Sequence, residues 1–308
     1  MNVLRGRNAL LTGANGGLGA FIADALSAAG VNVFLVDVND AGLASRTAEA
    51  VARGVRAGFL AADLRDPLAR EQAVAAARRN LGPVDLLINN AGVEYSARYD
   101  ELSPDQIEEV IAVNLRAPML LARLVLPEMR RRGTGHIVNL SSLAGESGPA
   151  FQESYAATKA GLTAFTFSLR ATFRGTGVSA SVVTPGFVDT GIYARLKSRT
   201  GVAAPPLLAP VPPARVAAAV LRAIREDRPE IIVSRYPVRP VMMALALWPR
   251  LGLWLITRLG THDFFRRVVD AEQRLGPGTP PSDGHVEESR DPAIKPASPS
   301  GSGPARTA

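Results

Sequence analysis

Short apolar runs alternate with longer amphipathic segments along most of the chain, from Asn8 to about Val233. The runs have the length and β-branched content of buried strands, and the segments between them repeat their apolar residues with the period of a helix. This alternation predicts right-handed βαβ crossovers and a parallel sheet with helices on both faces. The predicted strands are Asn8–Leu11, Val31–Asp37, Ala57–Ala61, Val84–Asn89, His136–Leu140, Val178–Val183 and Glu230–Val233.

The segments between the strands complete the prediction of a doubly wound α/β domain with a mostly parallel, seven-stranded sheet. A capping-box pattern at Ser103–Gln106 predicts where one of the helices begins. The Pro-rich stretch Gly201–Pro213 is incompatible with a regular helix or a central strand, and it predicts a mobile loop. The predicted helices include Ala20–Ala29, Pro67–Leu81, Pro104–Arg131 and Tyr155–Arg174.

A glycine-rich segment follows the first predicted strand and opens the first predicted helix. In this setting, glycines let the backbone turn tightly and approach a pyrophosphate, which binds at the positive end of the helix. The segment fits two spacings, Gly13-x-x-x-Gly17-x-Gly19 and Gly13-x-x-Gly16-x-x-Gly19, and the glycines alone do not choose between them. Either spacing, in this strand–turn–helix context, predicts a dinucleotide site.

Acidic and small residues end the next predicted strands at the same edge of the sheet. A carboxylate at Asp37 would hydrogen-bond the ribose hydroxyls and repel a 2′-phosphate, so we expect NAD rather than NADP. The nearest arginine beyond Asp37 is Arg46. Asp63, after the third strand, could accept a hydrogen bond from the adenine amino group. The stretch Asn89–Gly92 supplies small residues where the backbone passes close to the cofactor.

Tyr155 and Lys159 lie one helical turn apart at the start of a predicted helix. Lysine is scarce, because Lys159, Lys197 and Lys295 are the only lysines among the 35 basic residues of the chain. The two basic residue types differ near a titrating group, since lysine can release its proton and arginine keeps its charge. The pair therefore predicts proton transfer, in which the ammonium of Lys159 favours the phenolate and lowers the pKa of Tyr155.

Six motifs, taken in order, make the chain resemble the short-chain dehydrogenase/reductase family in its compact single-domain branch. The resemblance spans roughly residues 4 to 234 and implies a Rossmann-like domain at 1–236 that moves hydride between a nicotinamide dinucleotide and a secondary alcohol/ketone pair. The motifs are TGANGGLG (Thr12–Gly19), NNAG (Asn89–Gly92), Asn114 in VNLRAP, IVNLSS (Ile137–Ser142), YAATK (Tyr155–Lys159) and TPGFVDT (Thr184–Thr190).

The resemblance also implies roles for individual residues. Tyr155 would be the general acid and base, Lys159 would bind the nicotinamide ribose, and Asn114 would hold a water that links Lys159 to solvent. The family places its catalytic serine 13 residues before the tyrosine, which selects Ser142 over Ser141. The hydroxyl of Ser142 would then bind the reacting oxygen. The implied cofactor contacts are Gly13, Asn15, Gly17, Leu18, Gly19, Asp37, Asp63, Leu64, Asn90, Ala91, Gly92, Tyr155, Lys159, Pro185, Gly186, Val188 and Thr190.

Composition narrows the function classes further. The chain has no cysteine, which excludes disulfides, thiol catalysis and cysteine metal sites, and we identify no metal site. The net charge of +7 permits contact with anions, but no basic block with interleaved aromatic residues predicts nucleic-acid binding. Apolar residues after the sixth strand indicate a hydrophobic substrate of the steroid, retinoid or lipid kind. The family resemblance also implies that the protein is cytoplasmic and forms a homodimer or homotetramer.

The chain changes character after the last predicted strand. Residues 237–275 combine tryptophan and leucine with arginine. Pro249–Arg250 divides the apolar run, and neither uninterrupted part is long enough to span a membrane. It predicts a helical extension that lies on a membrane surface, covers the substrate entrance or contacts a second subunit. Residues 276–308 have the Pro-, Gly- and Ser-rich composition of a disordered tail.

Two other functions remain open at this stage. The first is an NADP-dependent carbonyl or 3-oxoacyl-thioester reductase, which differs in the cofactor and the substrate. The second is a noncatalytic nucleotide sensor or interaction protein on the same fold. The complete set of Asn114, Ser142, Tyr155 and Lys159 argues against a sensor, because a sensor does not need a proton relay.

Overall fold

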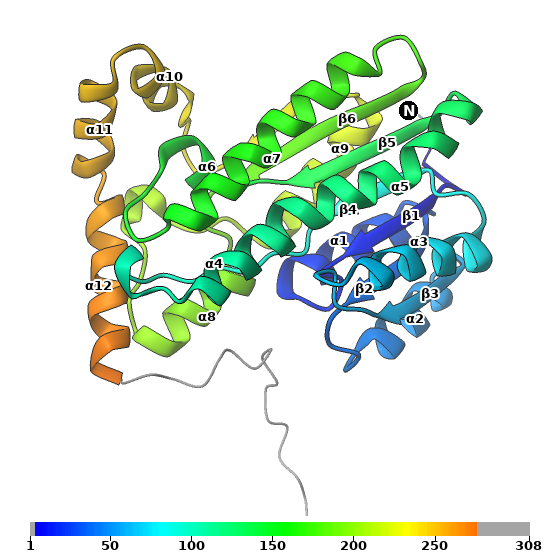
Figure 1. Cartoon of the computed structure of the whole chain (residues 1–308), viewed down its shortest axis with the longest axis horizontal. Coiled ribbons are helices and arrows are strands. Elements are labelled where there is room, and N and C mark those ends of the chain that lie inside the picture. Colours follow the sequence, from blue (N-terminus) through cyan, green and yellow to red (C-terminus); the bar gives the residue numbers. More distant parts are fainter. Residues whose placement is uncertain (1–3, 276–308) are drawn as a thin grey trace, which may run out of the picture. The chain divides into compact units, whose positions relative to one another are not determined.

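The computed structural model describes residues 4–275, and a seven-stranded sheet is their central element. All strand pairs are parallel, in the order β3-β2-β1-β4-β5-β6-β7. The order reverses between β1 and β4, and in such sheets ligands bind beyond the carboxyl ends of the strands at that point (Figure 1). The strands are β1 (Asn8–Thr12), β2 (Asn32–Asp37), β3 (Ala57–Ala61), β4 (Leu86–Asn89), β5 (Gly135–Leu140), β6 (Val178–Pro185) and β7 (Glu230–Val233).

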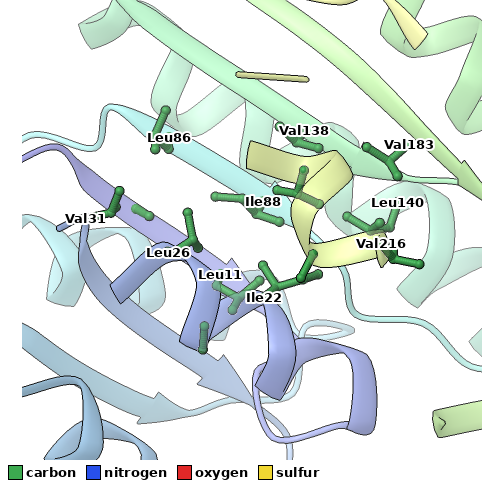
Figure 2. Close-up of a cluster of buried hydrophobic side chains, with 14 of the residues drawn as sticks. Leu11, Ile22, Leu26, Val31, Leu86, Ile88, Val138, Leu140, Val183 and Val216 are labelled. Carbon is green, nitrogen blue, oxygen red and sulfur yellow. The ribbon is translucent and has the colours of Figure 1, made fainter. Parts of the chain in front are cut away.

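Helices cover both faces of the sheet, as the sequence predicted. One buried apolar cluster lies between the sheet and α1, α2 and α9, and Figure 2 shows its centre, where side chains from β1, β4, β5 and α1 meet. A second cluster lies between the opposite face and α3, α5 and α7. The helices are α1 (Gly17–Ala28), α2 (Leu43–Ala52), α3 (Pro67–Leu81), α4 (Pro104–Ile111), α5 (Ala117–Arg132), α6 (Ala144–Ser147), α7 (Glu153–Thr172), α8 (Gly191–Thr200), α9 (Pro213–Arg225), α10 (Arg239–Leu247), α11 (Pro249–Arg258) and α12 (Thr261–Leu275).

The long helix predicted at Pro104–Arg131 is interrupted by a π-helical turn, Ala112–Arg116, which joins α4 to α5. Its predicted start is confirmed, because the Ser103 side chain accepts from the Gln106 backbone in a complete capping box. A π turn inserts an extra residue and redirects the side chains around it, and such turns are frequent at functional sites. Asn114 lies in the middle of this turn.

This same helical stretch, Pro104–Arg132, is the one among residues 4–275 that is long and apolar enough to cross a membrane by composition. Its α5 part, however, packs against the sheet, with Leu121, Val125 and Met129 buried in the second cluster. The apolar residues are therefore accounted for by the core of an α/β domain.

The Pro-rich stretch has no α-helix or sheet strand before Pro213, where α9 begins, so the predicted loop ends one residue earlier than expected. It contains a single 3₁₀ turn, Pro206–Leu208, and Val211 forms an isolated bridge with Val188. Val211 is also almost fully buried. The loop is thus anchored at its C-terminal end, and its mobility stays a prediction.

The C-terminal extension is helical, and its parts differ in how they are covered. Helix α12 packs on α8, and Phe264 is fully buried in an aromatic cluster with Phe187, Tyr193 and Phe265. Helices α10 and α11 pack on each other, and Gly252 is necessary there because a Cβ would lie 2.2 Å from the backbone of Leu245. The predicted tail, 276–308, lies outside the described residues.

Candidate active site

The glycine-rich loop between β1 and α1 has room for only one of the two spacings. Gly13 adopts a left-handed backbone conformation, with φ of 64°. A Cβ on Gly17 would lie 1.9 Å from Thr190 Oγ1, and one on Gly19 would lie 1.8 Å from the Gly13 carbonyl oxygen. A Cβ on Gly16 would come no closer than 3.6 Å to any of these neighbours. The structure therefore selects Gly13-x-x-x-Gly17-x-Gly19.

Asn90 fastens the end of β4 to this loop. Its side-chain amide donates to the carbonyl oxygens of Thr12 and Gly13, at 3.1 and 2.9 Å. The Thr12 hydroxyl in turn accepts from the backbone amides of Asn90 and Ala91, each at 3.1 Å. The close approach leaves no space for a Cβ on Gly13, which would lie 2.7 Å from Ala91 Cα. The NNAG motif is thus part of the same loop assembly at the switch point.

Asp37 ends β2 beside the glycine loop. Its carboxylate accepts from the backbone amides of Asn15 at 2.8 Å and Asn39 at 3.3 Å. Arg46 is remote from Asp37 in the sequence, but its Nε donates to Asn15 Oδ1 at 3.3 Å, since the start of α2 folds back against the loop. The structure therefore brings one cation near Asp37, and its guanidinium is held by a side chain of the loop.

Asp63 lies after β3 with its carboxylate already paired. Arg65 binds it at 2.7 Å and lowers the pKa of Asp63 through this hydrogen bond. Arg65 also forms an ion pair with Glu109 at 2.8 Å. The neighbouring Leu64 is buried in the apolar core. The adenine contact predicted for Asp63 stays a prediction, and it would have to share the carboxylate with Arg65.

Asn114 is fully buried and joins the π turn to the chain after β4. Its amide oxygen accepts from the Val93 backbone N–H at 2.9 Å, and its amide nitrogen donates to the Val93 carbonyl at 2.8 Å. A Cβ on Gly92 would lie 3.4 Å from Asn114 Oδ1 and 3.6 Å from Lys159 Nζ. The predicted residues Gly92, Asn114 and Lys159 are therefore neighbours.

The two adjacent serines after β5 have different partners. Ser141 is buried, and its hydroxyl donates to the Lys159 carbonyl oxygen at 2.9 Å. Ser142 instead hydrogen-bonds Tyr155, and its Oγ accepts from the Ala144 backbone at 3.1 Å. The structure thus places Ser142, rather than Ser141, against the tyrosine.

The electrostatics of Tyr155 differ from the expectation based on its spacing to Lys159. Burial raises the pKa of Tyr155 to about 12, the Ser142 hydrogen bond opposes this, and the Glu94 carboxylate raises the pKa further. Burial also lowers the pKa of Lys159 to about 8. The Lys159 ammonium lies 5.5 Å from the centre of the tyrosine ring and donates to the Leu140 carbonyl. The predicted net lowering of the tyrosine pKa is therefore not found in this geometry, because burial is the largest effect and Lys159 is not among the causes of the shift.

The stretch after β6 closes the site. The Gly186 amide donates to the Val233 carbonyl, and the Pro185 carbonyl accepts from Leu143, each at 2.9 Å. Thr190 is the N-cap of α8, and its hydroxyl abuts Gly17, as the space around that glycine shows. The residues of TPGFVDT thus connect the glycine loop with the chain that follows Ser142.

These groups meet at the carboxyl ends of β1, β2, β4, β5 and β6, and they fit a nicotinamide dinucleotide. The N-terminus of α1 suits a pyrophosphate, and there is no room for a Cβ at Gly13, Gly17 or Gly19. The acceptor Asp37 lies at one end and the Tyr155 hydroxyl group at the other.

Sequence reasoning missed several groups near the site. Glu94, Ser96 and Gln152 form a hydrogen-bonded cluster beside Tyr155, and Arg65 binds Asp63. None of these residues belongs to a spaced motif. The nearest signal was the position of Glu94, two residues after the NNAG motif, and of Gln152, three residues before the tyrosine.

Comparison with known proteins identifies the family. The sequence model described as short chain dehydrogenase matches residues 7–201. The chain is 40% identical over 248 residues to the ketoacyl reductase HetN of a Nostoc species, and the match covers 80% of this chain and 85% of that protein. It is 34% identical to a D-beta-hydroxybutyrate dehydrogenase of Cupriavidus necator over 61% of this chain and 73% of that one.

Among solved structures, a single-site variant of the actinorhodin polyketide ketoreductase with NADPH superposes with a TM-score of 0.67 at 30% identity. The match covers 76% of this chain and 98% of that one. Both the predicted fold class and the predicted family are confirmed by these similarities. The chain therefore belongs to the short-chain dehydrogenase family and is an NAD(P)-dependent oxidoreductase that acts on alcohol and ketone groups.

Proposed function

We propose that the chain reduces a hydrophobic ketone to a secondary alcohol, with Tyr155 as the proton donor. The observation that carries this proposal is the position of the Tyr155 side chain, which lies against Ser142 and one helical turn from Lys159, and burial raises the pKa of its phenol to about 12. A phenol with such a pKa is protonated at neutral pH, and this is the form that gives a proton to a ketone oxygen. A bound nicotinamide dinucleotide supplies the hydride for the reduction.

The other predicted residues have supporting parts in this reaction. Ser142 shares the reacting oxygen with Tyr155 as a second hydrogen-bond donor. Lys159 holds a cation within one helical turn of the tyrosine, at 5.5 Å from its ring. Asn114 fixes the backbone of Val93 and so shapes the wall of the site next to Lys159. The related ketoacyl reductase and polyketide ketoreductase support reduction as the direction.

A hydrophobic substrate is supported by the aromatic cluster that follows the site. Phe187 comes directly after Gly186, and its ring lies 5.0 Å from the ring of Phe264 in α12. Helix α12 is held over α8 by this cluster and by the ion pair between Glu272 and Arg199 at 2.9 Å. The C-terminal extension thus adds apolar surface on the side of the site where the chain after β6 lies. We assign α12 as the cover of the substrate region.

We propose NAD as the preferred cofactor, although the related polyketide ketoreductase is described with NADPH. Asp37 places a carboxylate at the end of β2, where it accepts hydroxyl donors and repels an added phosphate. Arg46 is the cation that would favour NADP, and its Nε is engaged by Asn15. The balance of these two groups decides the cofactor.

We also propose that α10 and α11 rest on an anionic membrane surface. Large apolar side chains of these helices and of the residue that joins them are exposed: Met243, Leu247, Trp248, Leu251, Leu253 and Trp254. The chain contains no acidic residue from Ile231 to His262, whereas Arg235, Arg239, Arg250 and Arg258 lie there. Exposed tryptophan and leucine beside arginine are typical of segments that bind the interface of anionic bilayers.

The experiment for the main proposal is a reduction screen followed by cofactor absorbance. Purified protein is supplied with NADH or NADPH and with ketones of increasing apolar size, from acetone to steroid ketones and fatty 3-oxo esters. We expect kcat/KM to rise with apolar size. Turnover of small ketones alone would contradict the hydrophobic substrate, and no turnover of any ketone would contradict the proposed reaction.

A further inference from the structure

Glu94 is a carboxylate at the site that the proposed reaction does not use. Its Oε1 accepts hydrogen bonds from the Ser96 hydroxyl and from the Gln152 side-chain amide, and Gln152 also donates to Ser96 Oγ at 2.7 Å. Gln152 is buried and stands at the N-terminus of α7, three residues before Tyr155. Glu94 is therefore fastened to the start of the helix that carries the tyrosine.

The other side of Glu94 is fixed by the chain that precedes it. The backbone N–H of Val93 donates to Asn114 Oδ1, and the Val93 carbonyl accepts from Asn114 Nδ2. These two hydrogen bonds fix the backbone directly before Glu94. Helices α8 and α12 also converge here, because charges of Arg195 and Glu272 both act on Glu94. Helices α8 and α12 pack against each other, and α4 packs against α7. The Glu94 carboxylate thus lies near Tyr155 and near the charged side chains of Arg195 and Glu272.

No cation neutralises this carboxylate by direct contact. Among residues 4–275, the ion pairs do not include Glu94, and its hydrogen-bond donors are a neutral hydroxyl and a neutral amide. Glu272 adds a second negative charge nearby, and burial raises the pKa of Glu94. The charge also reaches Tyr155, whose pKa it raises. Glu94 is therefore a carboxylate near Tyr155 that has only neutral hydrogen-bond donors, and Arg195 is the cation that acts on it without forming an ion pair.

We propose that Glu94 is a specificity-determining residue that excludes substrates with a carboxylate close to the reacting carbon and favours their neutral esters and thioesters. The inference rests on the proposed reaction at Tyr155. A substrate carboxylate beside Glu94 either meets a like charge or forces Glu94 to take up a proton, and both cost binding free energy in a desolvated site. A neutral ester meets neither cost.

Two similar proteins are named for substrates that differ in charge near the reacting carbon. One relative is named for ketoacyl groups and the other for beta-hydroxybutyrate, which carries a free carboxylate. The two names leave the charge of this chain's own substrate undecided. The position of Glu94 assigns the neutral class to this chain.

The test compares 3-hydroxyoctanoate with its methyl ester, which differ in charge and share the apolar chain and the secondary alcohol. The reverse reaction is followed as NADH or NADPH formation, and kcat/KM is measured for both compounds at neutral pH. We expect the wild-type protein to prefer the ester. In Glu94→Gln, which keeps the size and a hydrogen-bond acceptor, the ester-to-acid ratio should fall about tenfold or more, because the variant removes the repulsion between like charges.

Two further variants sharpen the result. Glu94→Ala removes the charge without adding an amide donor and should move the ratio in the same direction. Glu71→Gln removes one charge from the exposed surface of α3 and should leave the ratio unchanged. An unchanged ratio in both Glu94 variants, or a wild type that prefers the acid, would overturn the inference. If the wild type oxidises neither compound and reduces no ketone, the proposed reaction itself fails.

Discussion

Lys159 Nζ donates a 2.8 Å hydrogen bond to the carbonyl oxygen of Leu140, at the carboxyl end of β5. Both residues are buried, and Lys159 forms no ion pair with any acid among residues 4–275. Burial lowers the pKa of the ammonium to about 8 from its ordinary value of 10.5. The protein therefore keeps a desolvated cation at the site at the expense of folding stability.

This cost predicts a pH-dependent gain of stability in Lys159→Met. The folded-state pKa is lowered, so the penalty is complete below pH 8, fades between pH 8 and 10.5, and is absent above that range. At pH 7 the variant should be more stable by about 1–3 kcal/mol, with the lost hydrogen bond reducing the gain, and it should lose turnover. Urea unfolding at pH 7 and 10.5 measures the gap in the free energy of unfolding between Lys159→Met and the wild type. A gap that does not shrink at high pH would contradict this explanation.

The glycine loop predicts opposite results for two neighbouring glycines. Gly17→Ala should displace Thr190 and weaken dinucleotide binding strongly, because the new Cβ would lie 1.9 Å from the Thr190 hydroxyl. Gly16→Ala is the matched control, since its Cβ would meet only an atom at 3.6 Å. Calorimetric titration with NAD and NADP measures both variants. Loss of binding in Gly16→Ala with binding retained in Gly17→Ala would show that the loop follows the other spacing, and equal loss in the two variants would contradict the role of the free space around Gly16.

Asp37→Ser tests the cofactor proposal. Removal of the carboxylate beside Asn15 removes the repulsion of a 2′-phosphate and leaves Arg46 as the nearby charge. The NAD-to-NADP ratio of kcat/KM should fall by about tenfold or more, as a unit charge contact of at least about 1.4 kcal/mol implies. The wild-type protein should favour NAD. A wild-type preference for NADP would refute this interpretation of Asp37.

The membrane proposal is tested by flotation with liposomes that contain phosphatidylglycerol. Trp248→Ser with Trp254→Ser should reduce the bound fraction. Arg250→Gln with Arg258→Gln should also reduce it, by about thirtyfold in affinity at about 1 kcal/mol for each arginine. Phe59→Ser changes another exposed aromatic residue, on the edge strand β3, and serves as the control. These substitutions spare α12, whose Phe264 is buried. Binding that persists in both double variants would exclude this surface.

Local patterns were sufficient to predict the strands and the order of the motifs. The capping box at Ser103 and the βαβ alternation act over a few residues, and both appear in the structure as predicted. The choice of Ser142 over Ser141 needed the family spacing, and the structure agrees because Ser142 alone of the two contacts Tyr155.

Features that depend on burial or on distant contacts were not predictable. The π turn at Asn114 has no sequence signature of its own in an apolar helix. The pKa of Tyr155 follows from desolvation and from Glu94, which the helical spacing to Lys159 does not show. The packing of α12 on α8 joins segments far apart in the sequence, so the extension could be predicted as helical but not divided into a buried and an exposed part.

The central claim is that the Tyr155 hydroxyl group transfers the proton, and Tyr155→Phe tests it most directly. The variant removes only the hydroxyl, so the ring remains packed and Ser142 loses its partner. We expect kcat for ketone reduction to fall by about 10²–10⁴-fold, the range for loss of a general acid, while the Kd for the dinucleotide stays within a few-fold of the wild type. A variant that binds the dinucleotide and retains more than about a tenth of the wild-type kcat would contradict the assignment.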